Sequence, residues 1–333
     1  MSTLYITEQD TVLRKVDERI KVTRDKEVLL DIPLIKVNQI VITGRVTVTG
    51  ATVKELTERK IGLCYLNDWG RYLGRIEPEF SKNNLLRIEQ YRAFFDPLKS
   101  AKIARQFVKG KLYNQRTYIM RTHRDTPSPE LEKACDEIWH CIKKVQNEED
   151  IEKIRGYEGN AAASYFGVFN LLIKNTDFSF DHRRRRPPTD PVNALLSFGY
   201  SILRHDIGTA LNIVGFDPYL GYLHADRYGR PSLGLDLMEE FRPLIVDSVV
   251  LSSINKNVLK IEDFKEEFGN AVRLTDDGRK KFLRAFEERK QTEFKHPIFN
   301  YKVTYQKCFE LQARILAKHL TGELDEYTPL ITR

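Results

Sequence analysis

The first 80 residues alternate between apolar and polar positions, a period of two that is typical of half-buried β-strands. β-Branched residues are frequent in these segments, and charged residues, prolines or glycines separate them. An open sheet edge needs a partner, and a homodimer contact would supply one. We therefore expect a small β-strand domain over residues 1–80 that takes part in a homodimer. The alternation predicts strands over Thr3–Thr7, Thr11–Val22, Glu27–Ile32, Leu34–Thr43, Ile61–Leu66 and Arg71–Ile76, and one helix over Ala51–Lys60.

After Asn84 the apolar spacing changes to three and four residues, the period of an amphipathic α-helix. This change predicts a linker at Pro78–Asn84 and a larger α-helical domain over residues 85–333. Two late segments, Leu274–Gln291 and Lys302–Leu320, continue the helical spacing with basic outer faces. The pattern as a whole predicts an α+β chain, in which a small N-terminal β domain precedes a larger helical domain.

One helix of the second domain has clear end signals. Asp190 is a typical N-cap residue, and Pro191 stands at the first helical position, where a missing N–H costs nothing. Gly215 follows the last apolar position and is typical of a helix end. The segment between them is predicted to be a mostly buried helix.

Glu158 interrupts an apolar helical stripe that includes Ile154 and Ala161. A buried, ionised carboxylate without a partner costs several kcal/mol, so Glu158 needs a hydrogen-bond donor, a cation or a metal ion. Gly156 and Gly159 flank it, although each weakens a helix interior by about 1 kcal/mol relative to Ala. The glycines suggest that another helix or a ligand backbone passes close to Glu158. An ion pair with an arginine is the alternative to metal binding.

A second group of candidate ligands lies in GYLHADRYGRPSLGLDLMEEFRP, residues 221–243. His224 stands twelve residues before Asp236, and Glu239 follows three residues later. At about 100° per residue, Asp236 and Glu239 lie roughly 60° apart on a helix and can point at one place. An imidazole nitrogen with carboxylate oxygens suits Mn²⁺, with Mg²⁺ or Zn²⁺ as further choices. Taken alone, these residues more commonly form a polar loop and a solvated helix face.

The composition, 41% hydrophobic and 30% charged residues over 333 positions, is that of a globular protein. No run of about 18 apolar residues occurs, so a membrane span is not expected. The N-terminus, MSTLYITEQD, lacks the charged start and apolar core of a signal peptide, and we expect an intracellular protein. The four cysteines form no CxxC pair or zinc-site spacing and are expected to be reduced core thiols; they are Cys64, Cys135, Cys141 and Cys308.

Basic residues are concentrated in two places, and the formal net charge of +7 permits a polyanionic partner. The segment Pro97–Arg124 contains eight Lys or Arg and no Asp or Glu, and several of them form one helical stripe. Four consecutive arginines, Arg183–Arg186, precede two prolines in a loop. Either group is a solvated surface or a site for DNA phosphates. The candidate DNA-binding residues are Lys102, Arg105, Lys109, Arg116, Arg183, Arg184, Arg185 and Arg186.

Four segments, in this order and spacing, resemble the CRISPR-associated spacer-acquisition integrases, the Cas-one family. They are GYEGNAAASYF from Gly156, RRRRPPTDPVNALLSFGYSIL from Arg183, GYLH from Gly221 and RPSLGLDLMEEFRP from Arg230. Each motif is modest by itself, but together they are specific, and the resemblance spans most of the chain. The layout of a β-strand part followed by a helical part is also similar to that of the family.

The resemblance implies a metal site built from Glu158, His224 and Glu239, with Asp236 at a further acidic catalytic position of undefined role. It implies Mn²⁺ or Mg²⁺ as cofactor, and metal-dependent DNA cleavage and joining of new spacers to the CRISPR repeat in the prokaryotic cytoplasm. The expected partners are DNA, a second copy of the chain, and the small adaptation protein Cas-two. Two other hypotheses stay open: a non-catalytic nucleic-acid-binding scaffold, and a metal hydrolase acting on a small substrate.

Overall fold

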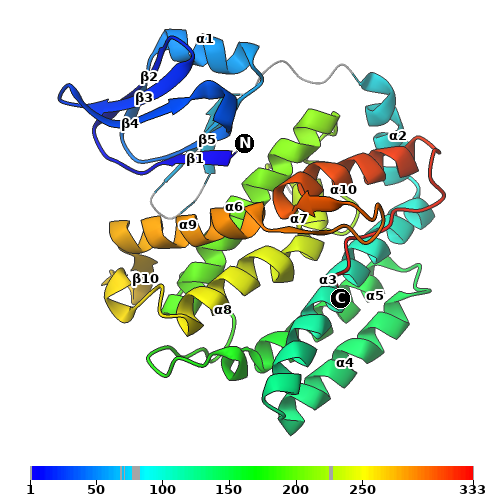
Figure 1. The fold of residues 1–333 in the computed structure, drawn as a ribbon. Coiled ribbons are helices and arrows are strands. Elements are labelled where there is room, and N and C mark those ends of the chain that lie inside the picture. Colours follow the sequence, from blue (N-terminus) through cyan, green and yellow to red (C-terminus); the bar gives the residue numbers. More distant parts are fainter. Residues whose placement is uncertain (1, 68–69, 71, 77–82, 225–227, 333) are drawn as a thin grey trace. The chain divides into compact units, whose positions relative to one another are not determined.

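The computed structural model describes residues 2–67, 70, 72–76, 83–224 and 228–332. Backbone contacts divide the chain into two compact units, residues 1–80 and 81–333, and each is described here by itself. The first unit consists mainly of strands and the second mainly of helices (Figure 1). The predicted α+β class is therefore confirmed. The predicted linker at Pro78–Asn84 falls largely on residues 77–82, outside the described residues.

The N-terminal unit contains two four-stranded sheets and the helix α1 (Gly50–Glu58). In the first sheet three strands run parallel and the last is antiparallel; its order is β1 (Ser2–Ile6), β5 (Val37–Thr43), β7 (Gly62–Leu66) and β8 (Tyr72–Ile76). The order of the second is β4 (Glu27–Pro33), β3 (Arg19–Arg24), β2 (Thr11–Val16) and β6 (Val46–Val48). Buried side chains from both sheets and from α1, among them Leu13, Ile40, Leu56 and Leu63, form one core.

The segment predicted as one strand, Thr11–Val22, is a hairpin instead. β2 and β3 pair antiparallel, and Val16 faces Arg19 across the turn. Asp17 adopts φ of 51° at the turn, a left-handed conformation that Asp tolerates better than most residues. The two-residue turn leaves the apolar residues Val16, Ile20 and Val22 at even spacings, and the pattern therefore conceals the reversal of the chain.

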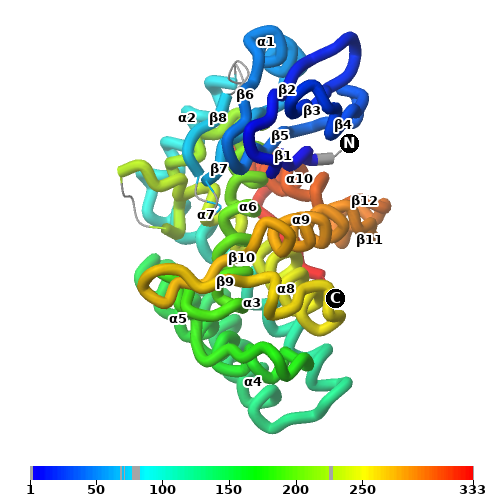
Figure 2. The backbone as a smooth tube through the Cα atoms, turned by 90° about the vertical axis from the view of Figure 1, so that its left-hand side faces the viewer, coloured from blue at the N-terminus to red at the C-terminus, as the bar shows by residue number. Residues whose placement is uncertain are grey.

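The C-terminal unit is a helical assembly arranged around the long helix α3, which has 29 residues. Helices α3, α4 and α5 pack against one another, and α6 packs against α7 and α10 (Figures 1 and 2). The helices are α2 (Asn84–Phe94), α3 (Pro97–Asp125), α4 (Pro129–Val145), α5 (Ile151–Gly167), α6 (Pro191–Val214), α7 (Ser232–Met238), α8 (Ser248–Asn255), α9 (Asp276–Gln291) and α10 (Tyr305–Leu320).

The predicted ends of α6 are confirmed. The side chain of Asp190 accepts a hydrogen bond from the backbone N of Asn193 at 2.8 Å, and Pro191 is the first helical residue. Gly215 ends the helix with φ of 111°, a left-handed conformation that favours glycine. Most side chains of α6 are buried, so this helix belongs to the interior of the unit.

Two short hairpins interrupt the helical part that the sequence pattern predicts. They are β9 (Phe264–Glu267) with β10 (Ala271–Leu274), and β11 (Glu293–Lys295) with β12 (Lys302–Thr304). As a result α9 begins at Asp276 and α10 begins at Tyr305, each slightly later than predicted. Strands of three or four residues are too short for a period of two to stand out in the sequence.

All four cysteines are buried free thiols, as predicted. Among the described residues, no helix combines the length and the apolar character needed to cross a membrane.

The segment that follows α10 is bound into the helical unit through the buried carboxylate of Glu240. Glu240 accepts hydrogen bonds from the Tyr327 hydroxyl and the Leu330 backbone N, both at 2.6 Å, and from Gln312 Nε2 at 3.2 Å. Asn114 of α3 donates to the carbonyl oxygens of Glu240 and Leu330, at 2.9 and 2.8 Å. These bonds connect the C-terminal segment to the residue after Glu239 and to the helix α3.

Replacing Tyr327 by Phe is expected to destabilise the chain more at pH 8 than at pH 6. Burial raises the pKa of Glu240 to about 7, while the hydrogen bonds from Tyr327, Leu330 and Gln312 act in the opposite direction. Because this pKa is raised on folding, ionisation of Glu240 reduces stability as the pH rises toward 7, and the Tyr327 hydroxyl limits that loss. Removing the hydroxyl leaves the ionised carboxylate less well satisfied, at a cost of about 1–3 kcal/mol.

Thermal unfolding of the wild type and of Tyr327→Phe at pH 6 and at pH 8 measures this difference in stability. Tyr301→Phe is the control, because Tyr301 is exposed. An equal loss of stability at pH 6 and pH 8 in Tyr327→Phe would contradict the prediction.

Candidate metal centre

Glu158 lies on α5 and faces the helix α3, against which α5 packs. Its Oε1 atom accepts a hydrogen bond from the ammonium of Lys111, on α3. The Lys111 side chain is 8% exposed, and that of Glu158 is 26% exposed. The partner that a carboxylate on an apolar face requires is thus a lysine, whereas the sequence suggested an arginine or a metal ion.

Glu239 brings a second carboxylate to the same ammonium. Its Oε2 atom lies 2.7 Å from Lys111 Nζ, and its Oε1 atom lies 3.0 Å from Arg242 Nε. Burial alone would raise the pKa of Glu239, but the charges of Arg242 and Lys111 outweigh this effect and lower it to about 2. The side chain is therefore ionised at neutral pH although it is only 4% exposed.

The backbone that carries Glu239 differs from the single helix that the sequence suggested. The α-helix α7 ends at Met238, and Glu239 begins a short 3-10 turn, which leads into a π-helical turn over Arg242–Asp247. Asp236 lies on α7 itself and is fully buried. The two acidic residues therefore perform different tasks: Glu239 faces Lys111, and Asp236 faces the segment that carries His224.

Asp236 fixes the orientation of His224. Its Oδ1 atom lies 2.6 Å from His224 Nδ1 and accepts from the His224 backbone N at 3.0 Å. Its Oδ2 atom accepts from the backbone N atoms of Tyr222 and Leu223, at 2.6 and 2.9 Å. A carboxylate in contact with so many N–H groups only accepts, so Nδ1 carries the proton. Nε2 is then free to act as a ligand, and it lies 3.8 Å from Glu239 Oε1.

The segment before His224 is held by its neighbours on two sides. Gly221 has no room for a side chain, because a Cβ atom there would lie 2.7 Å from Asp236 Oδ2. Gln90 of α2 donates to the carbonyl oxygens of Asp217 and Leu220, at 2.8 and 2.9 Å. Helix α2 thereby positions the turn that leads to the histidine.

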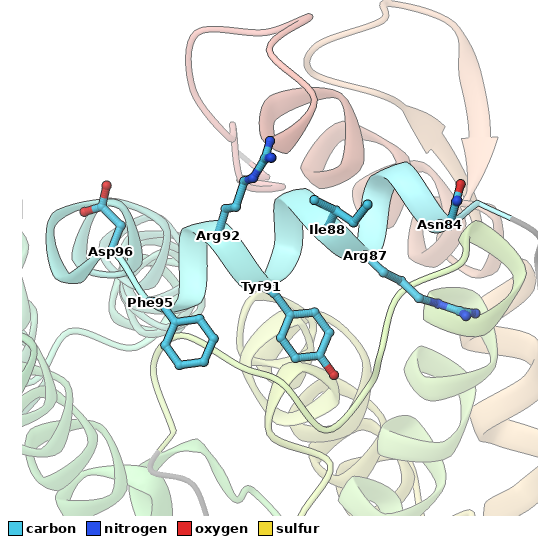
Figure 3. A pocket seen from close by; sticks show the side chains of 7 residues that line it. All are labelled: Asn84, Arg87, Ile88, Tyr91, Arg92, Phe95 and Asp96. Carbon is cyan, nitrogen blue, oxygen red and sulfur yellow. The ribbon is translucent and has the colours of Figure 1, made fainter.

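The outer side of α2 forms a shallow pocket (Figure 3). In the close-up, Tyr91 and Phe95 lie on the same side of the helix, and Arg92 points away from them. None of the candidate metal ligands lines this pocket. Helix α2 connects the pocket to the candidate centre. The hydroxyl of Tyr91, which lines the pocket, lies 3.3 Å from Oδ2 of Asp217, in the segment that leads to His224.

Two donor atoms of the centre have a spacing that fits a divalent cation. Two ligand atoms that share one ion at about 2.1 Å stand about 3–4 Å apart, and the 3.8 Å between His224 Nε2 and Glu239 Oε1 agrees with this spacing. Glu239 Oε2 is buried and receives no well-directed hydrogen bond within the described residues. In the part of the chain that the structure describes, no group of three His, Cys, Asp or Glu is already arranged around one point. The ammonium of Lys111 lies between the two glutamates instead.

Lys111 and Arg242 are the residues that the sequence analysis missed. Lys111 lies on the buried side of α3, where Ala104, Phe107 and Val108 are also buried. An isolated charge on an apolar stripe was the signal that singled out Glu158, and the same signal applies to Lys111. The signal of Lys111 is hidden by the other basic residues of Pro97–Arg124, which form a charged surface on the same helix.

Two of the candidate DNA-binding arginines are used in packing. Arg116 lies over the ring of Trp139, 5.1 Å from its centroid, and donates to the Cys135 carbonyl. Arg183 donates to Asn193 Oδ1 at 2.8 Å and lies over the ring of Tyr200.

The other candidate DNA-binding residues are more accessible to solvent. The side chain of Arg184 contacts His182 at 2.7 Å, yet this arginine is exposed. Lys102, Arg185 and Arg186 are exposed, and Arg105 and Lys109 are half-buried. Contact of any of the eight residues with DNA stays a prediction.

The fold and this centre define a class of two-part α+β proteins, in which the helical part brings two glutamates and an oriented histidine close together. The family model described as CRISPR associated protein Cas1 matches residues 4–288. The chain belongs to the Cas1 family of CRISPR-associated proteins, which confirms the resemblance seen in the four motifs.

Relatives and solved structures of this family extend over nearly the whole chain. The "CRISPR-associated endonuclease Cas1 3" of Thermus thermophilus is 40% identical over 332 residues, which cover 99% of this chain and 97% of the relative. The "CRISPR-associated endonuclease Cas1 2" of Rhodospirillum rubrum is 41% identical and covers 99% of this chain and 98% of its own length. A Cas1 structure from Thermotoga maritima superimposes with a TM-score of 0.83 at 24% identity and covers 98% of both chains.

A casposase bound to its integration product has the same fold. It superimposes with a TM-score of 0.87 at 23% identity, over 100% of this chain and 95% of the casposase.

Replacing Asp236 by Asn is expected to release His224 from its single tautomer. The amide would place an NH₂ group against backbone N–H donors, which leaves Nδ1 without a consistent acceptor. ¹⁵N NMR of the histidine side chains measures the proton position, and we expect Nδ1–H in the wild type and a mixture in the variant.

Asp181→Asn is the matched control, because Asp181 lies 2.6 Å from Nδ1 of the exposed His182. This control should alter the His182 signals and leave those of His224 unchanged. Unchanged His224 signals in Asp236→Asn would show that the carboxylate does not set the tautomer.

Proposed function

We propose that the chain is a metal-dependent DNA nuclease and integrase of CRISPR adaptation, which joins new spacer DNA to the repeat array. The observation that carries this proposal is the convergence of Glu158 and Glu239 on one ammonium, with His224 Nε2 3.8 Å from Glu239. Two carboxylates and one oriented imidazole are ligands that Mn²⁺ and Mg²⁺ accept. Membership of the Cas1 endonuclease family supports the same reading.

In this proposal Glu158, Glu239 and His224 Nε2 hold the cation, and Asp236 keeps the histidine in the ligating tautomer. The ion would supply charge neutralisation at the phosphate and a lower pKa for the attacking hydroxyl. Arg242 keeps Glu239 ionised and adds positive charge beside the phosphate. The chain itself thus contributes alignment of the two reacting groups.

The reaction that suits such a site is transesterification of a phosphodiester. The 3′-hydroxyl of the spacer DNA attacks a backbone phosphate of the repeat, a new P–O bond forms, and the displaced oxygen leaves as a hydroxyl. One phosphodiester replaces another, so the step requires no external energy source. When water is the nucleophile, the same site hydrolyses DNA.

The surface of α5 beside Glu158 leaves room for the DNA backbone. A Cβ atom added at Gly156 or Gly159 would meet nothing within 4 Å in the described structure, so these glycines serve no internal packing there. The sequence suggested that another helix or a ligand backbone passes close to Glu158. We therefore propose that the backbone of the DNA passes there. Exposed basic residues, such as Lys102, Arg185 and Arg186, would contact phosphates with little sequence preference.

DNA, a second copy of the chain and Cas2 are the proposed partners. One structural neighbour, a chain of a complex named Cas6-RT-Cas1–Cas2, superimposes with a TM-score of 0.81 at 25% identity. It covers 99% of this chain and 36% of that longer chain. The edge strands of the N-terminal sheets would form the homodimer contact.

Replacing Glu158 or His224 by Ala is expected to lower Mn²⁺-dependent strand transfer on a branched DNA substrate by roughly 100-fold or more, since each variant loses a ligand of the cation. DNA binding should change little, because phosphate contacts come from other residues. Gel assays of strand transfer and of binding measure the two effects separately.

Glu132→Ala and His140→Ala on α4 are the controls, as both side chains are exposed. Full strand transfer by both Glu158→Ala and His224→Ala would exclude the enzyme and favour a non-catalytic DNA-binding scaffold. DNA binding that is weak and insensitive to salt would favour a hydrolase of small substrates.

Replacing Gly159 by Gln is expected to stabilise the protein while it weakens DNA binding. Gln forms helix better than Gly, which gives about 0.5–1 kcal/mol, but its side chain would occupy the space proposed for the DNA backbone. Thermal unfolding and a DNA-binding titration measure the two effects.

Gly167→Gln, near the end of the same helix, is the matched control, because a Cβ atom there also meets nothing within 4 Å. It should leave DNA affinity unchanged. Equal DNA affinity in the two variants would show that the surface beside Glu158 is not the DNA path.

A further inference from the structure

Lys111 already occupies the position toward which the two candidate metal-binding glutamates point. Its ammonium contacts both Glu158 and Glu239, and the side chain is only 8% exposed. Glu239 is also paired with Arg242 at 3.0 Å. The charge of the glutamates is thus largely balanced by the protein itself.

A divalent cation and this ammonium compete for the same carboxylate oxygens. Two positive groups within a few ångströms repel each other, most strongly at a buried site. A cation that binds Glu158 and Glu239 must therefore displace Lys111 from at least one of these carboxylates. In the absence of a metal ion, the same contacts prevent the two carboxylates from repelling each other.

We propose that Lys111 is a positioning residue that acts as a built-in counter-cation, which keeps Glu158 and Glu239 assembled without metal and weakens metal binding by competition. This inference rests on the proposed function, since it takes the two glutamates as ligands of the cation. It goes beyond that function because it assigns opposite effects on metal-free stability and on metal affinity to one side chain.

The test compares Lys111→Met with the wild type in the absence of DNA. Without metal, the melting temperature of the variant should fall by roughly 5 °C or more, because two carboxylates lose a shared partner. Its affinity for Mn²⁺, measured by titration calorimetry, should rise by roughly tenfold, because the competing charge is gone. Saturating Mn²⁺ should accordingly raise the melting temperature more in the variant than in the wild type.

Lys290 offers a matched control elsewhere in the helical unit. It is fully buried and pairs with two carboxylates, Asp206 at 2.9 Å and Glu287 at 2.5 Å, neither of which is a candidate ligand. Lys290→Met should lower the melting temperature without any gain in Mn²⁺ affinity. A similar gain in both variants would mean that general loosening, and not competition at the site, causes it.

Lys111→Gln serves as a second variant, which keeps a hydrogen-bond donor but removes the charge. Unchanged or weaker Mn²⁺ binding in Lys111→Met and Lys111→Gln, with normal binding by the wild type, would overturn the inference and leave the proposed function intact. Failure of the wild type to bind Mn²⁺ even in the presence of DNA would instead count against the proposed function itself.

Discussion

The helical unit depends on one constraint: a carboxylate buried in it must be matched by a partner, because an unmatched buried charge is too costly to retain. Each buried acidic side chain meets this demand differently. Asp206 pairs with Lys290, and Asp236 accepts from three backbone N–H groups and His224. Asp247 accepts from the hydroxyls of Tyr165 and Tyr200, at 3.0 and 2.5 Å. These pairings connect helices that are far apart in the sequence.

The number of positive charges beside the carboxylate distinguishes the acid at the candidate centre from those elsewhere in the helical unit. Burial raises the pKa of Asp206 and of Asp247 to about 6 and that of Glu240 to about 7, in spite of their partners. At Glu239 the charges of Arg242 and Lys111 outweigh burial and the pKa falls to about 2. A carboxylate that stays ionised in a buried place has the property that a cation ligand needs.

Local patterns predicted the α+β class and the ends of α6, because caps and periodicity are properties of neighbouring residues. The same patterns did not reveal the hairpin of Thr11–Val22, whose two-residue turn keeps the period of two, or the 3-10 turn at Glu239, which is only 3 residues long. The family resemblance pointed to Glu158 and His224, but not to Lys111, whose contact with Glu158 spans 47 residues. Contacts of this kind arise only when the helices pack, and no local pattern contains them.

The C-terminal segment has a consequence for the order of events during synthesis. Glu240 is made 87 residues before Tyr327 and 90 before Leu330, the residues that satisfy its carboxylate. Until those residues have been synthesised, the Glu240 carboxylate has Gln312 as a donor but lacks Tyr327 and Leu330. Asn114, on the helix that carries Lys111, donates a hydrogen bond to the Leu330 carbonyl of the same segment. The turn that carries Glu239 and Glu240 is therefore completed by residues that are synthesised 87 and 90 positions after Glu240.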